Sequence, residues 1–501
     1  MIMVIKQTNS LCPVCGKVLP AEILEDKEQI FIERTCPEHG VFRHLYWSDA
    51  EMYKKFDLFE SIGHGIDNPQ FEAADGCPLD CGLCSNHKSG TLLANIDLTN
   101  RCNLDCDFCF ANARACGYVY EPTFDEIVAM LRLLRDQKPV PAPAVQFSGG
   151  EPTMRDDLFA IIRKAKEMGF GQVQVATNGI KLAQDPEYAR KMVDAGTNTV
   201  YLHFDGVTRE TNHMIKISLR ALENCRKVNL GIVLVPTIIN GRNDHEVGDI
   251  IRFAADNIQV VRGVNFQPVA FTGAASEDDI ERERVTIPDL MQRIEDQTGG
   301  VLKKEYFYPV PCVIPFSDLV ETYTGAPQVR FTTHQHCGAA TYGFVTADGI
   351  TPINEMIDVD GFFQAINQMA DKLHQDDGSI NKYKTLIEGI NDMRTSLKND
   401  KISSTTMFWK IIAQTLVKHD FSALRDFHWN ALFIGTMHFM DNYNYDTARV
   451  QRCCIHYATP DGKLIPFCTY NSGPVYREKV WNDYAQPITQ KDPIIDPDTI
   501  D

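Results

Sequence analysis

Three cysteines within residues 92–113, LLANIDLTNRCNLDCDFCFANA, have a spacing suited to an iron–sulfur cluster. Cys102, Cys106 and Cys109 are separated by three residues and then by two, and they follow an apolar run that we expect to be a strand ending at Asn100. Iron–sulfur clusters are commonly held by four thiolates. Three thiolates in one loop therefore leave one iron of a four-iron cluster open to another ligand. A zinc knuckle is the alternative, but such sites usually repeat CxxC pairs.

This loop resembles the cluster-binding motif of the radical S-adenosylmethionine (SAM) enzymes, CxxxCxxC with an aromatic residue, here Phe108, before the last cysteine. In that family the open iron chelates the amino and carboxylate groups of SAM, and an electron cleaves SAM to a 5′-deoxyadenosyl radical. The resemblance therefore implies a [4Fe-4S] cluster and SAM as cofactors. It also implies a low-potential electron donor of the ferredoxin or flavodoxin type as a partner.

The sequence Gly149-Gly150-Glu151-Pro152 stands at the end of the second expected strand. Paired glycines let the backbone approach a ligand closely and expose its amides. In the radical SAM family this GGEP motif binds the amino group of the SAM methionine, so the resemblance implies that role for these four residues. The alternative is a glycine turn that opens a helix.

The ends of later strands supply further candidate SAM contacts. Thr177 and Asn178 match a TNG motif of the family, which implies bonds to the SAM carboxylate or ribose. Val235 and Asn265 stand on the fifth and sixth expected strands, which in the family contact the adenine and ribose.

His203 and Asp205 stand at the end of the fourth expected strand. Residues two apart on a strand share one face, so we expect both side chains on the interior side of the sheet. They are the candidate catalytic residues. The alternative for His203 is a structural role, which is common for a lone histidine on a strand.

Apolar runs alternate with amphipathic helical stretches between residues 92 and 272, which predicts an α/β fold. The expected strands are 92–100, 144–150, 172–179, 199–206, 231–239 and 261–269, with helices such as 124–136 and 157–167 between them. Six βα units of this kind predict a parallel sheet, here a partial (β/α)6 radical SAM barrel. Sites in such sheets lie at the carboxyl ends of the strands, where the motifs above fall.

Residues 1–75 contain two short elements, Cys12-Pro-Val-Cys15-Gly and Cys36-Pro-Glu-His39-Gly. Each can form a tight turn that presents two ligands, and a strand-like stretch, EQIFIERT, lies between them. The spacing predicts a metal-binding ribbon with these four ligands. Zinc and a single rubredoxin-like iron, the latter with another cysteine as ligand, both remain open because both ions accept tetrahedral sulfur sites.

A second three-cysteine loop, Cys77, Cys81 and Cys84, lies in residues 76–91, directly before the first expected strand of the barrel. It repeats the spacing of the Cys102 loop but lacks the aromatic residue. We interpret it as an auxiliary cluster site. Alternatively, its thiols complete the N-terminal metal site, with Cys77 as the candidate ligand.

Residues 273–501 have a mainly helical pattern, with helices expected at 287–297, 360–373, 380–397 and 405–418. Four cysteines on loops or hairpins in this region can form another auxiliary cluster: Cys337, Cys453, Cys454 and Cys468. Adjacent cysteines rarely bind one zinc ion because neighbouring side chains diverge. Cys453 and Cys454 therefore suit a larger cluster or two different sites.

The composition argues against several other classes of protein. The 501 residues include 49 basic and 67 acidic side chains, and the net charge of −18 makes nucleic-acid binding unexpected. The N-terminus is too short and polar for a signal peptide, and no apolar run approaches the ~18 residues of a membrane span. Sixteen cysteines, mostly in short-spaced groups, indicate metal ligands in a reducing cytosol. We therefore expect a cytoplasmic, oxygen-sensitive metalloenzyme.

The chain resembles more narrowly the archaeal radical SAM family of tetraether lipid synthases. The shared motifs are CPVCG, CPEHG, DGCPLDCGLCSNHKS, LTNRCNLDCDFCFANA, VRGVNFQPVAFTG, HQHCG and RCCIHYATPDGKLIPFCTYN. That family uses three four-iron clusters and one rubredoxin-like iron. The thirteen grouped cysteines of this chain fall short of the fifteen that such a set needs. Either one auxiliary cluster has three thiolates or a histidine contributes.

The resemblance implies an enzyme that couples isoprenoid chain termini of archaeal lipids, and this is the function we expect. A lipid substrate implies peripheral membrane contact and an apolar channel, which the apolar region 405–440 can line unless it is ordinary helix core. The same family is linked to methylation of 7,8-dihydro-6-hydroxymethylpterin in methanopterin biosynthesis, and this is the alternative. Such a small-molecule substrate needs a polar pocket, with Asp205 and Asn265 as candidates.

Overall fold

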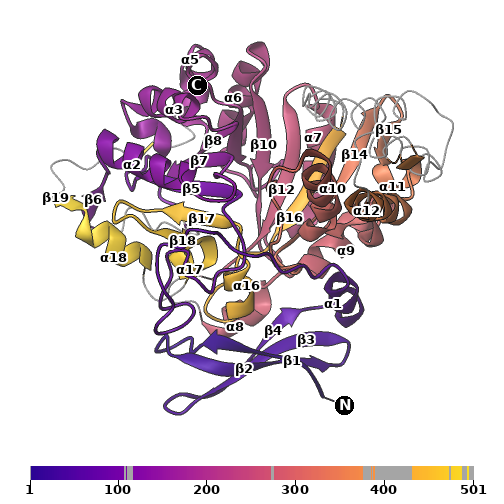
Figure 1. Ribbon diagram of the computed structural model, residues 1–501. Coiled ribbons are helices and arrows are strands. Elements are labelled where there is room, and N and C mark those ends of the chain that lie inside the picture. Colours follow the sequence, from indigo (N-terminus) through magenta and orange to yellow (C-terminus); the bar gives the residue numbers. More distant parts are fainter. Residues whose placement is uncertain are drawn as a thin grey trace.

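The structure is a computed structural model that describes residues 2–106, 109, 117–271, 276–375, 385, 388–389, 431–472, 476–487 and 494–495 (Figure 1). A four-stranded sheet lies near the N-terminus, and a larger mixed sheet forms the centre of the molecule. The C-terminal elements, yellow in Figure 1, lie partly between these two sheets.

The N-terminal sheet is an antiparallel meander in the order β1-β2-β3-β4. Its strands are Met3–Leu11, Val18–Asp26, Gln29–Cys36 and Gly40–Trp47, and helix α1 (Ala50–Asp57) follows. The expected strand EQIFIERT is therefore confirmed as β3. Asp49 caps α1, because its Oδ1 accepts a hydrogen bond from the Met52 N–H at 2.9 Å.

Six parallel strands in the order β5-β7-β8-β9-β10-β12 form the middle of the large sheet. Their bounds are Leu93–Thr99, Ala144–Gly149, Gln172–Thr177, Thr199–His203, Gly231–Val235 and Val261–Pro268. All six strands expected from the sequence are confirmed. Each strand lies beside its predecessor, as short βα connections require.

Helices between these strands cover one face of the sheet (Figure 1). They are α2 (Phe124–Arg135), α3 (Leu158–Glu167), α4 (Ile180–Gln184), α5 (Tyr188–Ala195), α6 (Ile215–Lys227) and α7 (Val247–Asp256). The expected helices 124–136 and 157–167 are confirmed as α2 and α3. Alternate strand residues such as Ile96, Phe147 and Val175 belong to the same hydrophobic core as the helices.

The opposite side of the sheet, which we call the inner face, is polar along its first four strands. Because strand side chains alternate between faces, the inner face receives the residues between the core positions: Asn95, Asp97, Gln146, Ser148, Gln174, Tyr201 and His203. The expectation that His203 and Asp205 lie on the interior side therefore holds for His203, the last residue of β9.

The C-terminal region differs from the expected helical pattern in the part that the structure describes. Strands β16 (Ala431–Met437) and β17 (Ile455–Ala458) pair in parallel with β12 and β5 and extend the central sheet at both edges. The run ALFIGTM of β16 had been expected to be helix-like. It is mostly buried, and a short buried apolar run shows no periodicity that separates strand from helix.

The remaining elements surround this sheet. The strands are β6 (Tyr118–Tyr120), β11 (Thr237–Ile238), β13 (Tyr308–Pro309), β14 (Gly338–Thr346), β15 (Gly349–Pro352), β18 (Leu464–Pro466) and β19 (Ala485–Pro487). The helices are α8 (Glu277–Glu283), α9 (Ile287–Gln297), α10 (Ile314–Thr324), α11 (Ile353–Met356), α12 (Val359–Gln375), α16 (Thr447–Gln451), α17 (Phe467–Ser472) and α18 (Tyr476–Asp483). The expected helices 287–297 and 360–373 are confirmed as α9 and α12. Most of 380–397 and all of 405–418 lie outside the described residues.

Candidate active site and metal centres

The Cys102 loop begins at the carboxyl end of β5, the edge at which parallel sheets carry their sites. Cys102 is half-buried, and burial raises the pKa of its thiol to about 12. Cys106 and Cys109 are exposed, and Phe108 lies outside the described residues. Metal binds the thiolate, so iron at Cys102 must displace a proton from a thiol that burial keeps neutral.

The two glycines of the GGEP motif pack against this loop. Gly149 has a φ of +126°, and a Cβ at that position would lie 2.2 Å from the Thr99 carbonyl oxygen. The Gly150 N–H donates to the same Thr99 oxygen at 2.7 Å, and the Glu151 N–H donates to the Arg101 oxygen at 2.8 Å. The sequence suggested that these amides are exposed to a ligand. The amides of Gly150 and Glu151 instead hydrogen-bond the motif to the backbone at the start of the cysteine loop.

Glu151 links the GGEP and TNG motifs. Its side chain is buried, and Oε1 accepts hydrogen bonds from the hydroxyls of Thr153 and Thr177 at 2.5 and 2.8 Å. Oε2 accepts from the Asn178 N–H at 2.8 Å, while Asn178 Nδ2 donates to Asn103 Oδ1, also at 2.8 Å. The residues predicted to bind SAM after β7 and β8 therefore form one hydrogen-bonded unit with the cysteine loop.

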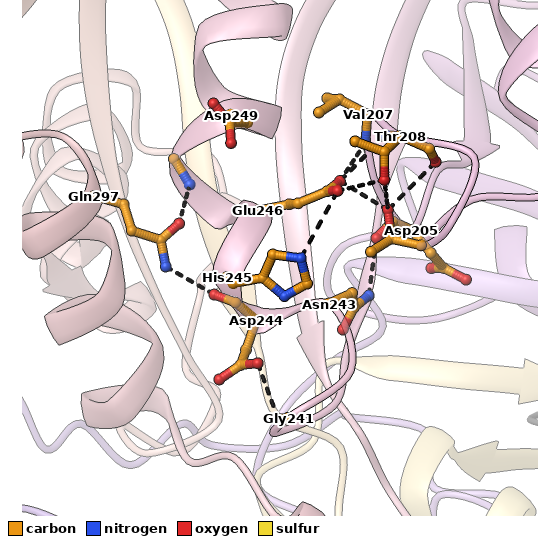
Figure 2. Close-up of polar contacts among 12 residues, drawn as sticks. Asp205, Val207, Thr208, Gly241, Asn243, Asp244, His245, Glu246, Asp249 and Gln297 are labelled. Atoms are coloured by element: carbon orange, nitrogen blue, oxygen red, sulfur yellow. Dashed lines mark hydrogen bonds and ion pairs between the residues drawn. The ribbon is translucent and has the colours of Figure 1, made fainter.

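His203 and Asp205 are brought together as the sequence suggested. His203 Nε2 lies 2.9 Å from Asp205 Oδ2, and the Asp205 carboxylate raises the pKa of the His203 imidazole. Asp205 Oδ1 also accepts from the Thr237 N–H at 2.9 Å. Asn243 Nδ2 donates to the Asp205 carbonyl at 2.8 Å, so Asp205 is held at both its backbone and its side chain (Figure 2).

Glu246, which the sequence did not single out, fixes the loop after Asp205 (Figure 2). Its carboxylate is buried and accepts from the Val207 N–H at 2.7 Å, the Thr208 hydroxyl at 2.5 Å and the Thr211 hydroxyl at 2.8 Å. Burial raises the pKa of Glu246, but hydrogen bonds led by those of Thr208 and Thr211 outweigh it, so the pKa is lowered overall. Glu246 is therefore ionised at neutral pH.

Replacing Glu246 by glutamine is expected to destabilise the protein by about 2 kcal/mol at pH 7, because a buried amide then faces hydrogen-bond donors. A lowered pKa stabilises the folded state above the unfolded pKa of about 4.3, and this stabilisation disappears as the pH falls through the folded pKa. The difference between wild type and variant in urea unfolding should therefore be nearly the same at pH 7 and pH 5 and should shrink as the pH falls below about 4.3. Glu223→Gln, at a half-exposed ion pair with Arg226, is the control. An equal loss of unfolding free energy in Glu223→Gln would contradict the stabilising role assigned to Glu246.

Val235 and Asn265 lie on the inner face of β10 and β12, both half-buried. Asn265 stands opposite Gly435 of β16 in the parallel register. The structure thus places these two residues on the same face as His203, on strands that follow it in the sheet.

The N-terminal ligands converge on one point. The donor atoms of Cys12, Cys15, Cys36 and His39 all lie within 4.8 Å of one another. Cys36 Sγ lies 3.4 Å from His39 Nδ1, and Cys15 Sγ lies 3.9 Å from Cys36 Sγ. Three sulfurs and one imidazole nitrogen in this arrangement suit a tetrahedral structural zinc site. In the described part of the chain no other set of Cys, His, Asp or Glu donors converges as closely.

The Cys77 loop lines a small cavity. Cys77, Cys81 and Cys84 all contribute to its wall, together with His87. A hydrogen bond with Cys81, and then burial, raise the pKa of Cys77, which shows that these two thiols are adjacent. Asp80 Oδ2 accepts from the N–H groups of residues 74, 75 and 76 at 2.8, 2.7 and 2.7 Å and so fixes the turn before Cys77. Cys77 packs against a hydrophobic cluster that includes Leu11 and Met440, and the N-terminal site has four ligands without it.

Cys337 is the common neighbour of the other C-terminal cysteines. The pKa values of Cys453, Cys454 and Cys468 are all raised, first by burial and also by the Cys337 thiol. Cys453 Sγ donates to the Ile455 carbonyl at 3.0 Å, whereas Cys454 points toward the Arg452 carbonyl at 3.8 Å. The adjacent side chains therefore diverge, as expected from the sequence.

Arg449 is a buried cation beside this group that sequence reasoning missed. Its Nε donates to Cys337 Sγ at 3.3 Å, and its Nη2 donates to the His438 carbonyl at 2.6 Å. Burial lowers the pKa of Arg449, but nearby Cys337 and Tyr46 outweigh it, so the pKa is raised overall. The only hint in the sequence is an arginine four residues before Cys453.

Comparison with known proteins agrees with this geometry. The radical SAM superfamily model matches residues 96–254, and the HMPTM N-terminal zinc ribbon domain matches residues 4–48. The protein is thus a radical SAM enzyme with an N-terminal zinc ribbon. It is 48% identical over 495 residues to 7,8-dihydro-6-hydroxymethylpterin dimethyltransferase of Methanocaldococcus jannaschii, covering 97% of this chain and 96% of the relative. The chain belongs to the family of that enzyme.

Two more distant relatives share part of the chain. Fe-coproporphyrin III synthase of Methanosarcina barkeri is 31% identical over 209 residues, 39% of this chain and 50% of the relative. GTP 3′,8-cyclase of Clostridium acetobutylicum is 28% identical over 210 residues, 40% of this chain and 63% of the relative.

The expected function, tetraether lipid synthesis, is wrong. A protein 48% identical over almost the whole chain is named for a pterin, which favours the alternative. The motifs that suggested lipid coupling mostly surround cysteine ligands, as in CPVCG, HQHCG and LTNRCNLDCDFCFANA, and metal ligands do not distinguish a lipid from a pterin substrate. Part of the proposed apolar channel is strand β16 of the central sheet. In the residues that the structure covers, no helix is long and apolar enough to cross a bilayer.

The zinc ribbon should hold about one zinc ion per chain, because its four donors are complete without another region of the protein. Cys36→Ser is expected to lose that zinc and to melt the four-stranded sheet at a lower temperature. Elemental analysis of the purified proteins checks this. One iron per chain at this site, with rubredoxin-like absorption, would show that the ribbon selects iron.

Proposed function

We propose that this protein is a radical SAM methyltransferase that acts on 7,8-dihydro-6-hydroxymethylpterin. The observation that carries the proposal is the 48% identity to the pterin dimethyltransferase over 97% of the chain. The polar inner face of the central sheet supports it, because a small heteroaromatic substrate needs hydrogen-bonding side chains and an isoprenoid chain does not. Each methylation replaces a C–H bond by a C–CH3 bond. The hydrogen leaves in 5′-deoxyadenosine, with methionine as the other product of SAM. The methyl donor leaves as its demethylated anion, and the reductant supplies the two electrons that SAM cleavage and methyl transfer consume.

We assign the cofactors to the clusters of residues described above. The parallel strands form the partial (β/α)6 barrel, and Cys102, Cys106 and Cys109 hold a [4Fe-4S] cluster that, when bound, supplies the electron for SAM cleavage. A low-potential ferredoxin or flavodoxin reduces it. Glu151 positions the GGEP and TNG backbones for SAM, since its carboxylate accepts from the N–H of Thr153, directly after GGEP, and from the N–H of Asn178 in TNG.

The other cysteine groups are proposed auxiliary cluster sites. Cys77, Cys81 and Cys84 form one set, for which the turn held by Asp80 is the scaffold. The second set is Cys337, Cys453, Cys454 and Cys468. In the second set, the divergence of Cys453 and Cys454 fits a cluster that is larger than a single ion. Arg449 donates to a thiolate there and offsets negative charge.

Anaerobic incubation of the reconstituted enzyme tests the substrate. With SAM, a reductant and a methyl donor, the dihydropterin is expected to give 5′-deoxyadenosine and methylated pterin, measured by liquid chromatography and mass spectrometry. An archaeal dialkylglycerol lipid is the comparison substrate. Coupled lipid without methylated pterin would refute the proposal.

A further inference from the structure

Carboxamide side chains meet on the inner face at one level of the central sheet. Asn95, Gln146 and Gln174 are direct neighbours in the parallel registers of β5, β7 and β8. Gln146 Nε2 donates to Asn95 Oδ1 at 2.9 Å. Burial raises the pKa of Tyr201 on the next strand, and a hydrogen bond with Gln174 opposes this. The amide nitrogen of Gln146 is therefore bonded to Asn95, and Gln174 is bonded to Tyr201.

Two acceptors of this row have no donor among the described residues. Gln146 Oε1 and Gln174 Oε1 are buried atoms without a hydrogen-bond partner there, and residue Gln174 is only 8% exposed. Buried polar atoms are nearly always paired, and an unpaired acceptor destabilises the folded state. Apolar residues of similar size would fill the same space, so two glutamines at adjacent positions indicate a ligand that donates hydrogen bonds.

We propose that Gln146 and Gln174 bind the aminopyrimidinone edge of the pterin, with their Oε1 atoms accepting from its 2-amino group and adjacent ring N–H. This inference rests on the proposed function and names the residues that select its substrate. Neighbouring strands lie about 4.8 Å apart, a separation that two glutamine side chains can close onto a single ring edge. The pterin edge carries two donors side by side, which matches two unpartnered acceptors on register-paired residues of neighbouring strands.

The depth of the row also fixes the orientation of the ring. Gln146 and Gln174 come three residues before Gly149 and Thr177, about 10 Å along the strands. The pyrimidinone edge is then deep in the sheet interior, and the reduced ring with its hydroxymethyl group points toward the Cys102 loop. The carbon atoms to be methylated face the end at which SAM is cleaved.

Binding measurements on the reconstituted holoenzyme test this directly. We expect Gln174→Leu and Gln146→Leu each to weaken binding of 7,8-dihydro-6-hydroxymethylpterin by about 10- to 100-fold, the range for a lost buried hydrogen bond, measured anaerobically by equilibrium dialysis. Affinity for SAM should stay unchanged. Gln172→Leu, the same change on the same strand at a side chain that donates to Thr199 Oγ1 at 3.0 Å, is the control and should bind as wild type.

A substrate analogue with oxygen in place of the 2-amino group sharpens the test. Wild type should prefer the amino compound, and at least one of the two leucine variants should lose this preference. If wild type binds the pterin and both variants bind it equally well, the inference is wrong while the proposed function stands. If SAM affinity falls instead, the glutamines serve the adenine. Absence of pterin binding to wild type would refute the proposed function as well. Because two variants are measured, the test still gives an answer if one of them fails to fold.

Discussion

Replacing Cys106 by alanine is expected to abolish 5′-deoxyadenosine formation. Loss of groups that merely support a metal ligand already costs 10- to 100-fold, so loss of a ligand should cost more than about 100-fold. Cys106 is exposed, so its removal leaves no cavity in the core. The assay is anaerobic SAM cleavage with dithionite, with product quantified by liquid chromatography.

The matched control is Cys312→Ala, because Cys312 stands outside every cysteine group. It should keep wild-type cleavage. The zinc content of both variants should equal that of wild type, since the ribbon ligands lie in a separate sheet. Substantial 5′-deoxyadenosine from a folded Cys106→Ala protein would remove the central claim about this loop.

Replacing Cys468 by alanine should separate SAM cleavage from product formation. Cys468 follows β18, and its Sγ accepts from the Met440 N–H at 3.3 Å. It belongs to a different group of thiols from Cys102. We therefore expect 5′-deoxyadenosine to form while methylated pterin falls by at least about 10-fold, the lower range for damage to a metal site.

Folding must be established first, because Cys468 packs against the buried cluster that contains Leu11, Met440 and Tyr445. Circular dichroism and iron content of Cys468→Ala, compared with Cys312→Ala, separate loss of a cluster from loss of structure. An unchanged product yield from a folded variant that has lost iron would make this group a structural support only. Loss of both products would place the cluster on the path to SAM cleavage.

Several features of this protein could be predicted from the sequence because they depend on residues that are close together along the chain. The spacing of Cys102, Cys106 and Cys109 spans eight residues, and the ribbon ligands come from two short turns. The six strands were also predictable, because each is a short apolar run bounded by turn residues and alternating with a periodic helix. These local patterns determine the radical SAM chemistry and the central parallel strands.

The C-terminal contribution to the sheet could not be predicted in the same way. Strand β17 pairs with β5, although more than 350 residues separate Ile455 from its partner Leu93. Strand β16 is a buried apolar run that fits strand or helix equally well from sequence. Pairing across such separations is decided by which edge of the sheet is free once the six inner strands have formed.

The residues that select the substrate were the feature that depended most on tertiary structure. The motifs for clusters and SAM are shared between lipid and pterin enzymes. They therefore indicate the type of reaction but do not identify the substrate. Gln146 and Gln174 alternate with apolar residues on their strands, and the sequence does not show that their oxygens lack partners among the described residues. The buried contacts of Glu246 and Arg449 are likewise invisible locally. The energy of a buried polar atom depends on its neighbours in space. Only folding brings those neighbours within hydrogen-bond distance of these side chains.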